Sequence, residues 1–126
     1  MERITEIYVL LENKPSVLGD LCTHLAENEV NIEAIGVFSG AAKLYVKSLS
    51  KAVKVLEKHG YPTEVRDVLL VDLVNKPGAL AELTTKLGDE GINIEYLYGT
   101  LARKGDSVSV ILDVTNIDRA EQILKG

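Results

Sequence analysis

Two kinds of segment alternate along this chain. In one, apolar and polar residues alternate over a short run, and in the other an apolar residue recurs every three or four positions. Residues 4–11 are rich in β-branched and aromatic side chains and predict a strand. The next segment has its apolar residues at i, i+3, i+4 and i+7, which predicts a helix that buries Leu18, Leu21, Cys22 and Leu25. Pro15 suits the first turn of that helix, where its missing N–H costs nothing. The remaining elements of this half are a strand at 30–38, a tight turn at Ser39-Gly40, a return strand at 44–47, a helix near 52–59 and a strand at 62–67.

The second half of the chain predicts the same order of elements. It begins with a strand at 68–74 and a helix at 77–89 that turns Leu80, Leu83 and Leu87 inward. A strand at 92–101, a turn at Lys104-Gly105-Asp106, a strand at 108–114 and a last helix striped by Ile117, Ala120, Ile123 and Leu124 follow. Each half therefore reads βαββαβ, which is typical of an α+β, ferredoxin-like fold with two helices on one face of an antiparallel sheet.

The two halves also repeat at the level of residues. Asn13-Lys14-Pro15 returns as Asn75-Lys76-Pro77, a shift of 62 positions (75 minus 13), and Asn31-Ile32-Glu33 returns as Asn93-Ile94-Glu95 at the same shift. We therefore predict two domains, residues 1–66 and 67–126. A unit of about 60 residues buries only about 60% of its unfolded surface, so we expect the two domains to share an interface.

The second copy breaks the pattern, because the sequence ends after its second helix and no fourth strand follows. No linker separates the strands predicted at 62–67 and 68–74. We predict that two long strands run through both domains, and that residues 2–6 supply the missing edge strand of the second domain, which leaves no bare edge at the junction. The alternative is an open, three-stranded second sheet.

Composition narrows the function. The net charge is −5 and no basic stripe is present, which argues against nucleic acid and against anionic membranes. No apolar run approaches the roughly 20 residues of a membrane helix, and the N-terminus does not resemble a signal peptide. The single cysteine, Cys22, cannot form an internal disulfide, so we expect a soluble, cytoplasmic protein. The two histidines lack a ligand cluster: His24 is expected on the solvated side of its helix and His59 at a helix end, and neither a metal nor another cofactor is predicted.

The repeated motif resembles the signature of ACT domains, the small-molecule-sensing modules of amino-acid metabolism. That signature is Asn-x-Pro-Gly-x-Leu after a first strand, with Gly-(Val/Ile)-Asn-Ile at the start of the second. The second half matches it with Asn75-Lys76-Pro77-Gly78-Ala79-Leu80 and Gly91-Ile92-Asn93-Ile94. The first half has Asn13-Lys14-Pro15-Ser16-Val17-Leu18 and Glu29-Val30-Asn31-Ile32. The chain is similar to stand-alone proteins that carry two ACT domains and no enzyme.

The loop before each helix is a reasonable place for a ligand, since the free N–H groups of a helix N-terminus attract a carboxylate. The resemblance implies that Asn13–Leu18 and Asn75–Leu80 bind an amino acid or a related small carboxylate. It also implies that Asn31, Ile32, Asn93 and Ile94 contact the ligand from a neighbouring domain. Ser16 and Glu29 replace glycines of the second copy, so the second site is expected to be the better one. Serine-binding members have a histidine where this chain has Leu11 and Leu73, which argues against serine as the ligand.

No nucleophile–base pair or phosphate loop is recognisable, so catalytic residues are not predicted. The expected function is regulatory: binding shifts a domain or chain arrangement and signals to a separate partner, such as a metabolic enzyme. A homodimer through the edge strands 30–38 and 92–101 is expected. Two alternatives remain, a ligand-free scaffold for protein interaction and an unrecognised enzyme.

Overall fold

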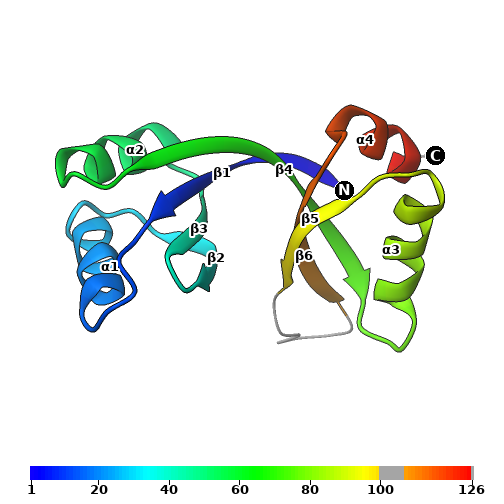
Figure 1. The fold of residues 1–126 in the computed structure, drawn as a ribbon, viewed down its shortest axis with the longest axis horizontal. Helices are drawn as coiled ribbons and strands as arrows, with labels where there is room; N and C mark the ends of the chain where they lie inside the picture. The colour runs from blue at the N-terminus through cyan, green and yellow to red at the C-terminus, as the bar shows by residue number, and fades with distance from the viewer. Residues whose placement is uncertain (100–106, 126) are drawn as a thin grey trace. The chain divides into compact units, whose positions relative to one another are not determined.

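The order of secondary-structure elements in a computed structural model of the protein follows the predicted pattern (Figure 1). The structure describes residues 1–99 and 107–125, so the predicted turn at Lys104-Gly105-Asp106 lies outside the described residues. The elements are β1 (Glu2–Leu10), α1 (Val17–Glu27), β2 (Ile32–Phe38), β3 (Ala41–Val46), α2 (Leu49–Lys58), β4 (Thr63–Val74), α3 (Ala79–Asp89), β5 (Ile94–Gly99), β6 (Ser107–Val114) and α4 (Ile117–Lys125). None of the helices in these described ranges has the length and apolar character needed to cross a membrane.

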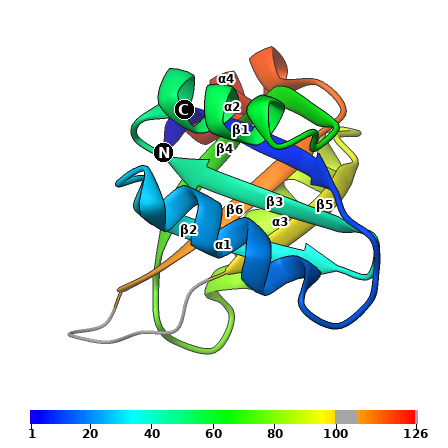
Figure 2. The ribbon, with the colours of Figure 1, turned by 90° about the vertical axis from the view of Figure 1, so that its left-hand side faces the viewer.

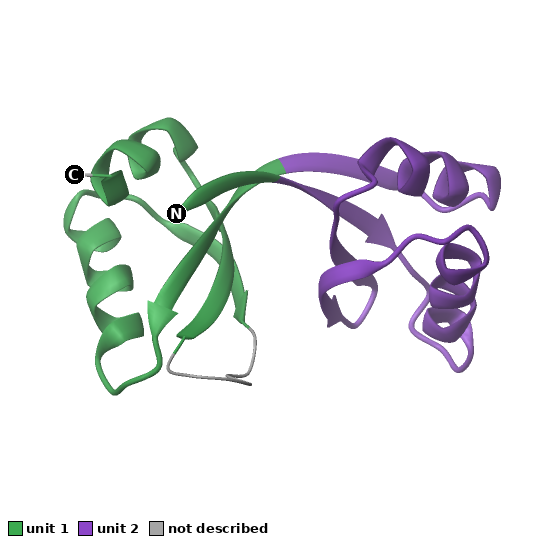
Figure 3. Ribbon diagram, turned by 180° about the vertical axis from the view of Figure 1, so that it is seen from behind, with its two compact units in different colours: residues 1–4, 67–126 green, residues 5–66 purple. Residues whose placement is uncertain are grey.

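The chain divides into two compact units (Figure 3). Unit 2 comprises residues 5–66, and unit 1 comprises residues 1–4 together with 67–126. The strands predicted separately at 62–67 and 68–74 form one continuous strand, β4. Both β1 and β4 therefore contribute residues to both units, β1 with its first residues in unit 1 and β4 with its first residues in unit 2.

Unit 2 has the strand order β2-β3-β1-β4. The pairs β1–β3 and β2–β3 are antiparallel, with Ile7 opposite Leu44 and Ile35 opposite the same leucine. At the far end of β1, the Leu10 N–H donates to the Pro62 carbonyl just before β4. Helices α1 and α2 cover one face of these strands (Figure 2). The side chains buried between helices and sheet are Ile7, Val9, Leu11, Leu21, Leu25, Val30, Ala42, Leu44, Val46, Ala52, Val55 and Leu56.

Unit 1 repeats this arrangement with the strand order β1-β4-β6-β5. The pairs β4–β6 and β5–β6 are antiparallel, with Leu69 opposite Leu112 and Leu97 opposite the same residue. Helices α3 and α4 pack on one face of the sheet (Figure 1). The buried cluster of this unit consists of Leu69, Val71, Leu83, Leu87, Ile92, Val110, Leu112, Val114 and Ala120. The predicted α+β, ferredoxin-like fold with an antiparallel sheet is confirmed.

Arg3 ties the beginning of β1 to unit 1. Its guanidinium donates to Asp118 Oδ1 at 2.8 Å and Glu121 Oε1 at 2.9 Å on α4, and to Asp67 Oδ2 at 3.1 Å on β4. The repeat places Val65 at the corresponding position of unit 2 (3 plus 62), so unit 2 has no equivalent of this cation. Residues 1–4 are thus held in unit 1 by charge as well as by strand pairing.

Two expectations about the helix starts were wrong. Helices α1 and α3 begin at Val17 and Ala79, so Pro15 and Pro77 lie before the N-cap residue and not in the first turn. The reason is the backbone at the N-cap, which is left-handed and so cannot belong to a right-handed helix. The later start moves the first helical positions toward solvent: Leu18 is 39% and Leu80 45% exposed, although both were predicted to face inward.

Candidate ligand-binding site

The two loops that precede α1 and α3 have the same backbone conformation. Ser16 has φ 74° where Gly78 has φ 94°, and in the turns that follow the two helices Glu29 has φ 59° where Gly91 has φ 75°. In both loops a tight turn closes onto the loop lysine, because Val17 N–H donates to the carbonyl of Lys14 and the equivalent Ala79 N–H to that of Lys76. The replacement of glycine in the first copy, which was expected to weaken that site, therefore leaves the loop backbone unchanged.

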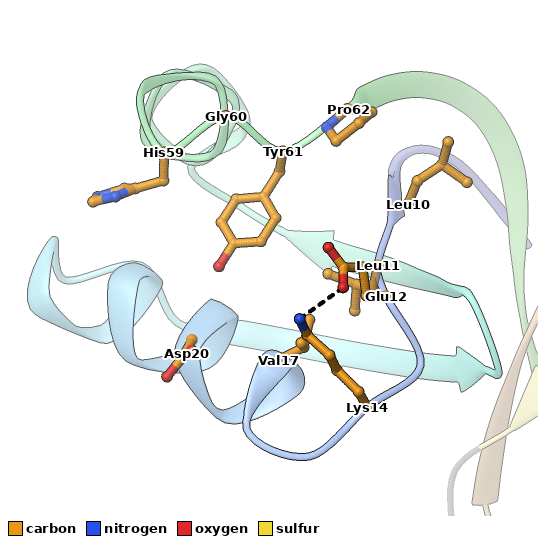
Figure 4. Close-up of a pocket in the computed structure, with 10 residues that line it drawn as sticks. All are labelled: Leu10, Leu11, Glu12, Lys14, Val17, Asp20, His59, Gly60, Tyr61 and Pro62. Atoms are coloured by element: carbon orange, nitrogen blue, oxygen red, sulfur yellow. Dashed lines mark ion pairs between the residues drawn. The ribbon is translucent and has the colours of Figure 1, made fainter.

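A cavity of about 560 Å³ lies beside the first loop in unit 2 (Figure 4). Its walls come from the end of β1, the first turn of α1 and the connection between α2 and β4. The lining residues are Leu10, Leu11, Glu12, Lys14, Val17, Asp20, His59, Gly60, Tyr61 and Pro62. The floor is apolar and the rim carries charged groups, which is the usual character of a small-molecule site.

An ion pair crosses the rim of this cavity. Lys14 Nζ lies 2.8 Å from Glu12 Oε2, and both side chains are largely exposed (Figure 4). The hydrogen bond, together with the charge of its partner, lowers the pKa of Glu12 and raises the pKa of Lys14. The first-turn residue Asp20 lines the same cavity and forms no ion pair within the described residues, so it leaves the cavity with one uncompensated negative charge.

Aromatic side chains form the wall opposite α1. Burial raises the pKa of the Tyr61 hydroxyl, with smaller contributions from the charges of Asp20 and Cys22, so this phenol stays protonated at neutral pH. Behind it, the imidazoles of His24 and His59 stack with their ring centroids 3.7 Å apart. The prediction that His24 lies on the solvated side of α1 was wrong: its Nδ1 is buried and has no hydrogen-bond partner within the described residues.

Two smaller cavities border the second loop in the described part of unit 1. One, of about 320 Å³, is lined by Asp72, Leu73, Val74, Lys76, Ala79, Glu82, Leu83, Lys86 and Leu124. The other, of about 240 Å³, is lined by Leu73, Val74, Asn75, Lys76, Ala79, Leu80, Val108 and Val110. The first corresponds to the cavity of unit 2, because each is formed by the same strand end, loop and first helical turn.

The repeat allows the two cavities to be compared position by position. Lys76 and Glu82 of unit 1 stand where unit 2 has Lys14 and Asp20. Other lining positions differ: Asp72 stands in place of Leu10, Ala79 in place of Val17, and Val74, which is 56% exposed, in place of Glu12. In the described part of unit 1 the Lys76 ammonium consequently has no ion-pair partner.

The predicted site residues divide into two groups. Those that line these three cavities are Lys14, Val17, Asn75, Lys76, Ala79 and Leu80. Those that do not are Asn13, Pro15, Ser16, Leu18, Asn31, Ile32, Pro77, Gly78, Asn93 and Ile94. The backbone of Asn93 is held by Thr115, which donates its N–H to the Asn93 carbonyl and accepts the Asn93 N–H through its hydroxyl. A role for Asn31 and Asn93 toward a neighbouring domain stays a prediction.

Sequence reasoning missed the other cavity residues. An acidic residue in the first turn of both repeated helices, Asp20 and Glu82, was visible as a repeat but is also a common helix-stabilising feature. Nothing in the sequence marked Tyr61, since only the fold brings the α2–β4 connection beside α1. The described residues contain no group of three His, Cys, Asp or Glu side chains placed to hold a metal ion.

Comparison with known protein families finds a similarity in the second half of the chain. The family model of the ACT domain matches residues 68–125. The match covers α3, β5, β6 and α4 together with most of the unit 1 part of β4. A comparison with curated protein sequences found no significant match.

Solved structures with a similar fold include a protein from Bacteroides thetaiotaomicron and two regulatory subunits of aspartate kinase. Protein BT0572 of Bacteroides thetaiotaomicron is 28% identical, with a TM-score of 0.91 over 98% of this chain and 87% of that one. The ligand-free regulatory subunit of aspartate kinase from Thermus thermophilus is 21% identical, with a TM-score of 0.70 over 99% and 94% of the two chains. The corresponding subunit from Thermus flavus is also 21% identical, with a TM-score of 0.71 over 99% and 90%. The likeness to these two subunits shows the fold alone.

Proposed function

We propose that both units are ACT domains and that the chain is a non-catalytic regulatory protein that binds an amino acid or a related small carboxylate. The ligand contacts the loops at 13–18 and 75–80, with Asn31, Ile32, Asn93 and Ile94 contributing from a neighbouring domain. The bound protein signals to a separate cytoplasmic partner, such as a metabolic enzyme. The ACT match at 68–125 and the shared βαββαβ order of the two units support the tandem assignment.

The observation that carries this proposal is the cavity beside each Asn-Lys-Pro loop. In both units the loop lysine lines that cavity, and the strand end and first helical turn supply apolar contact area. A lysine ammonium at the mouth of an apolar cavity suits a small carboxylate, because the charge orients one end of the ligand while the apolar wall contacts the rest.

The two sites are expected to differ in affinity. Lys76 has no ion-pair partner among the described residues, whereas Lys14 is paired with Glu12 at 2.8 Å. A ligand carboxylate at Lys14 therefore competes with Glu12 for the lysine ammonium. This favours the second site, in agreement with the ranking from the sequence but through different residues.

Thermal-shift screening with the twenty amino acids and their 2-oxo acids tests the proposal. A ligand at one hundred times its dissociation constant adds about 2.7 kcal/mol to the free energy of unfolding, which is readily detected. Asn75→Ala and Lys76→Met are expected to reduce the response more than Asn13→Ala and Lys14→Met. If no compound raises the melting temperature, the sensor function is wrong.

The second candidate function is a ligand-free scaffold, and the outer edge of unit 2 favours it. Strand β2 ends the strand order of this unit, and its residues Ile35, Val37 and Phe38 are large, apolar and at least two-fifths exposed. An exposed strand edge of this kind pairs readily with another chain, and we propose a homodimer through it. If the chain is a scaffold, sedimentation should show a dimer for the wild type and a monomer for Val37→Lys. No ligand should then raise the melting temperature, which distinguishes this function from the first.

A further inference from the structure

A lysine and a carboxylate recur together in both halves of the chain. In unit 2, Lys14 in the loop and Asp20 in the first turn of α1 line one cavity. In unit 1, Lys76 and Glu82 line the corresponding cavity with the same spacing along the chain. Several side chains around them differ between the copies, as with Glu12 and Val74. This pair of opposite charges is the charged part of the lining that both copies share, and Leu11 and Leu73 are a shared apolar part.

The two carboxylates have no cation of their own. Within the described residues neither Asp20 nor Glu82 forms an ion pair. Lys86 also lines the unit 1 cavity, one turn along α3 from Glu82, and forms no ion pair in the described structure. The charge of Asp20 contributes, after burial, to the raised pKa of the Tyr61 hydroxyl on the opposite wall of the cavity. The carboxylate therefore acts across the cavity and not only on its own helix.

We propose that Asp20 and Glu82 are specificity-determining residues that bind the ammonium group of the ligand, opposite the lysine that binds its carboxylate. The ligand class is then a zwitterionic α-amino acid, and the corresponding 2-oxo acid is rejected because it leaves the carboxylate without a partner. This inference rests on the proposed function, and it assigns a role to two residues outside the repeated loop motif.

The rest of the lining indicates the ligand side chain. In unit 2 the cavity is bounded by Leu11, Val17 and the Tyr61 ring, and in unit 1 by Leu73 and Leu83. These surfaces suit an apolar side chain. The cavity of about 560 Å³ in unit 2 admits a larger one than the cavity of about 320 Å³ in unit 1.

The test is isothermal titration of the full chain with matched pairs of probes, each apolar amino acid beside its 2-oxo acid, for example leucine beside 4-methyl-2-oxopentanoate. Loss of one charge-assisted hydrogen bond corresponds to about tenfold or more in affinity, so the amino acid is expected to bind at least that much more tightly. The double variant Asp20→Asn with Glu82→Gln should remove the difference. Asp20→Glu, which copies the natural residue of the other unit, should preserve it.

Two carboxylates outside the cavities serve as controls. Glu27 on α1 and Asp89 on α3 are exposed and are not among the lining residues, so Glu27→Gln and Asp89→Asn should leave the preference unchanged. Equal binding of amino acid and 2-oxo acid by the wild type overturns the inference while the proposed function stands. Persistence of the preference in the double variant also overturns it. If no probe binds at all, the proposed function fails and the inference fails with it.

Discussion

Equivalent leucines in the two cores provide a direct test of how far the units depend on one another. Leu25 on α1 and Leu87 on α3 occupy the same position of the repeat, and both are fully buried. Replacement of either by alanine removes buried methyl groups and leaves a cavity, which costs about 3 kcal/mol or more. An unfolding entropy of about 2.1 cal/mol/K per residue gives the 126 residues about 0.26 kcal/mol/K, so each variant should melt about 11 °C lower.

The form of the transition matters more than its midpoint. Because β1 and β4 each run through both units, melting of one unit removes strands from the other. We therefore expect one cooperative transition in the wild type and in both variants. At about 0.7 kcal/mol per residue, the 126 residues give an unfolding enthalpy of about 90 kcal/mol, and the van't Hoff enthalpy should equal this calorimetric value.

Differential scanning calorimetry measures both enthalpies in one experiment. Two independent units would instead show a van't Hoff enthalpy near half the calorimetric one, with Leu25→Ala shifting one transition and Leu87→Ala the other. That result would refute the reasoning. Leu18→Ala and Leu80→Ala are matched controls on the same helices; their side chains are already 39% and 45% exposed, so each should cost well under half as much.

Three further outcomes are expected. Ser16→Gly should raise the free energy of unfolding by about 1 kcal/mol in a denaturant titration, since φ 74° strains any residue with a Cβ, and destabilisation would contradict this. Arg3→Gln should speed amide hydrogen exchange at residues 2–4 and in α4 but not in α1 or α2; uniform protection loss would show that Arg3 does not act locally. In an ultraviolet titration the Tyr61 phenol should ionise at higher pH than an exposed tyrosine. Asp20→Asn should remove only part of this upward shift, because burial is its larger cause. The pKa of Tyr61 is higher in the folded than in the unfolded protein. The contribution of the Tyr61 phenol to the free energy of unfolding is therefore present below pH 10 and is lost as the pH rises beyond it.

The α+β fold could be predicted because its signals are local. A helical stripe such as Leu21 and Leu25 and a β-rich run such as residues 4–11 each need only a short window of sequence. The helix starts could not be predicted in the same way. The turn that closes on Lys14 and Lys76 puts the N-cap in the left-handed region, and the proline before it fits a helix start one or two residues earlier equally well.

The candidate site was predictable only on the side that the repeat marks. Asn-Lys-Pro identified one wall of each cavity, and the lysines Lys14 and Lys76 do line them. The opposite wall of unit 2 comes from the α2–β4 connection, far away along the chain, and Tyr61 there has no signature of its own. His24 was misplaced for the same reason, since its stacking partner His59 belongs to another helix end.

Among the differences between the two cavities, the exchange of Glu12 for Val74 bears most directly on the loop lysine, so the two proposed sites are expected to fill over different concentration ranges. Both side chains of the Glu12–Lys14 pair are largely exposed, so the solvent screens their attraction and a ligand that competes with Glu12 is expected to lose only a modest part of its affinity. The Glu12 carboxylate would also lie near the carboxylate of a bound ligand and repel it, which is expected to add to the difference at low salt. Val74 imposes neither penalty in unit 1. The proposed site of unit 1 is therefore expected to fill at lower ligand concentration than that of unit 2. This order requires no difference in the loops themselves, which have the same backbone and the same lysine.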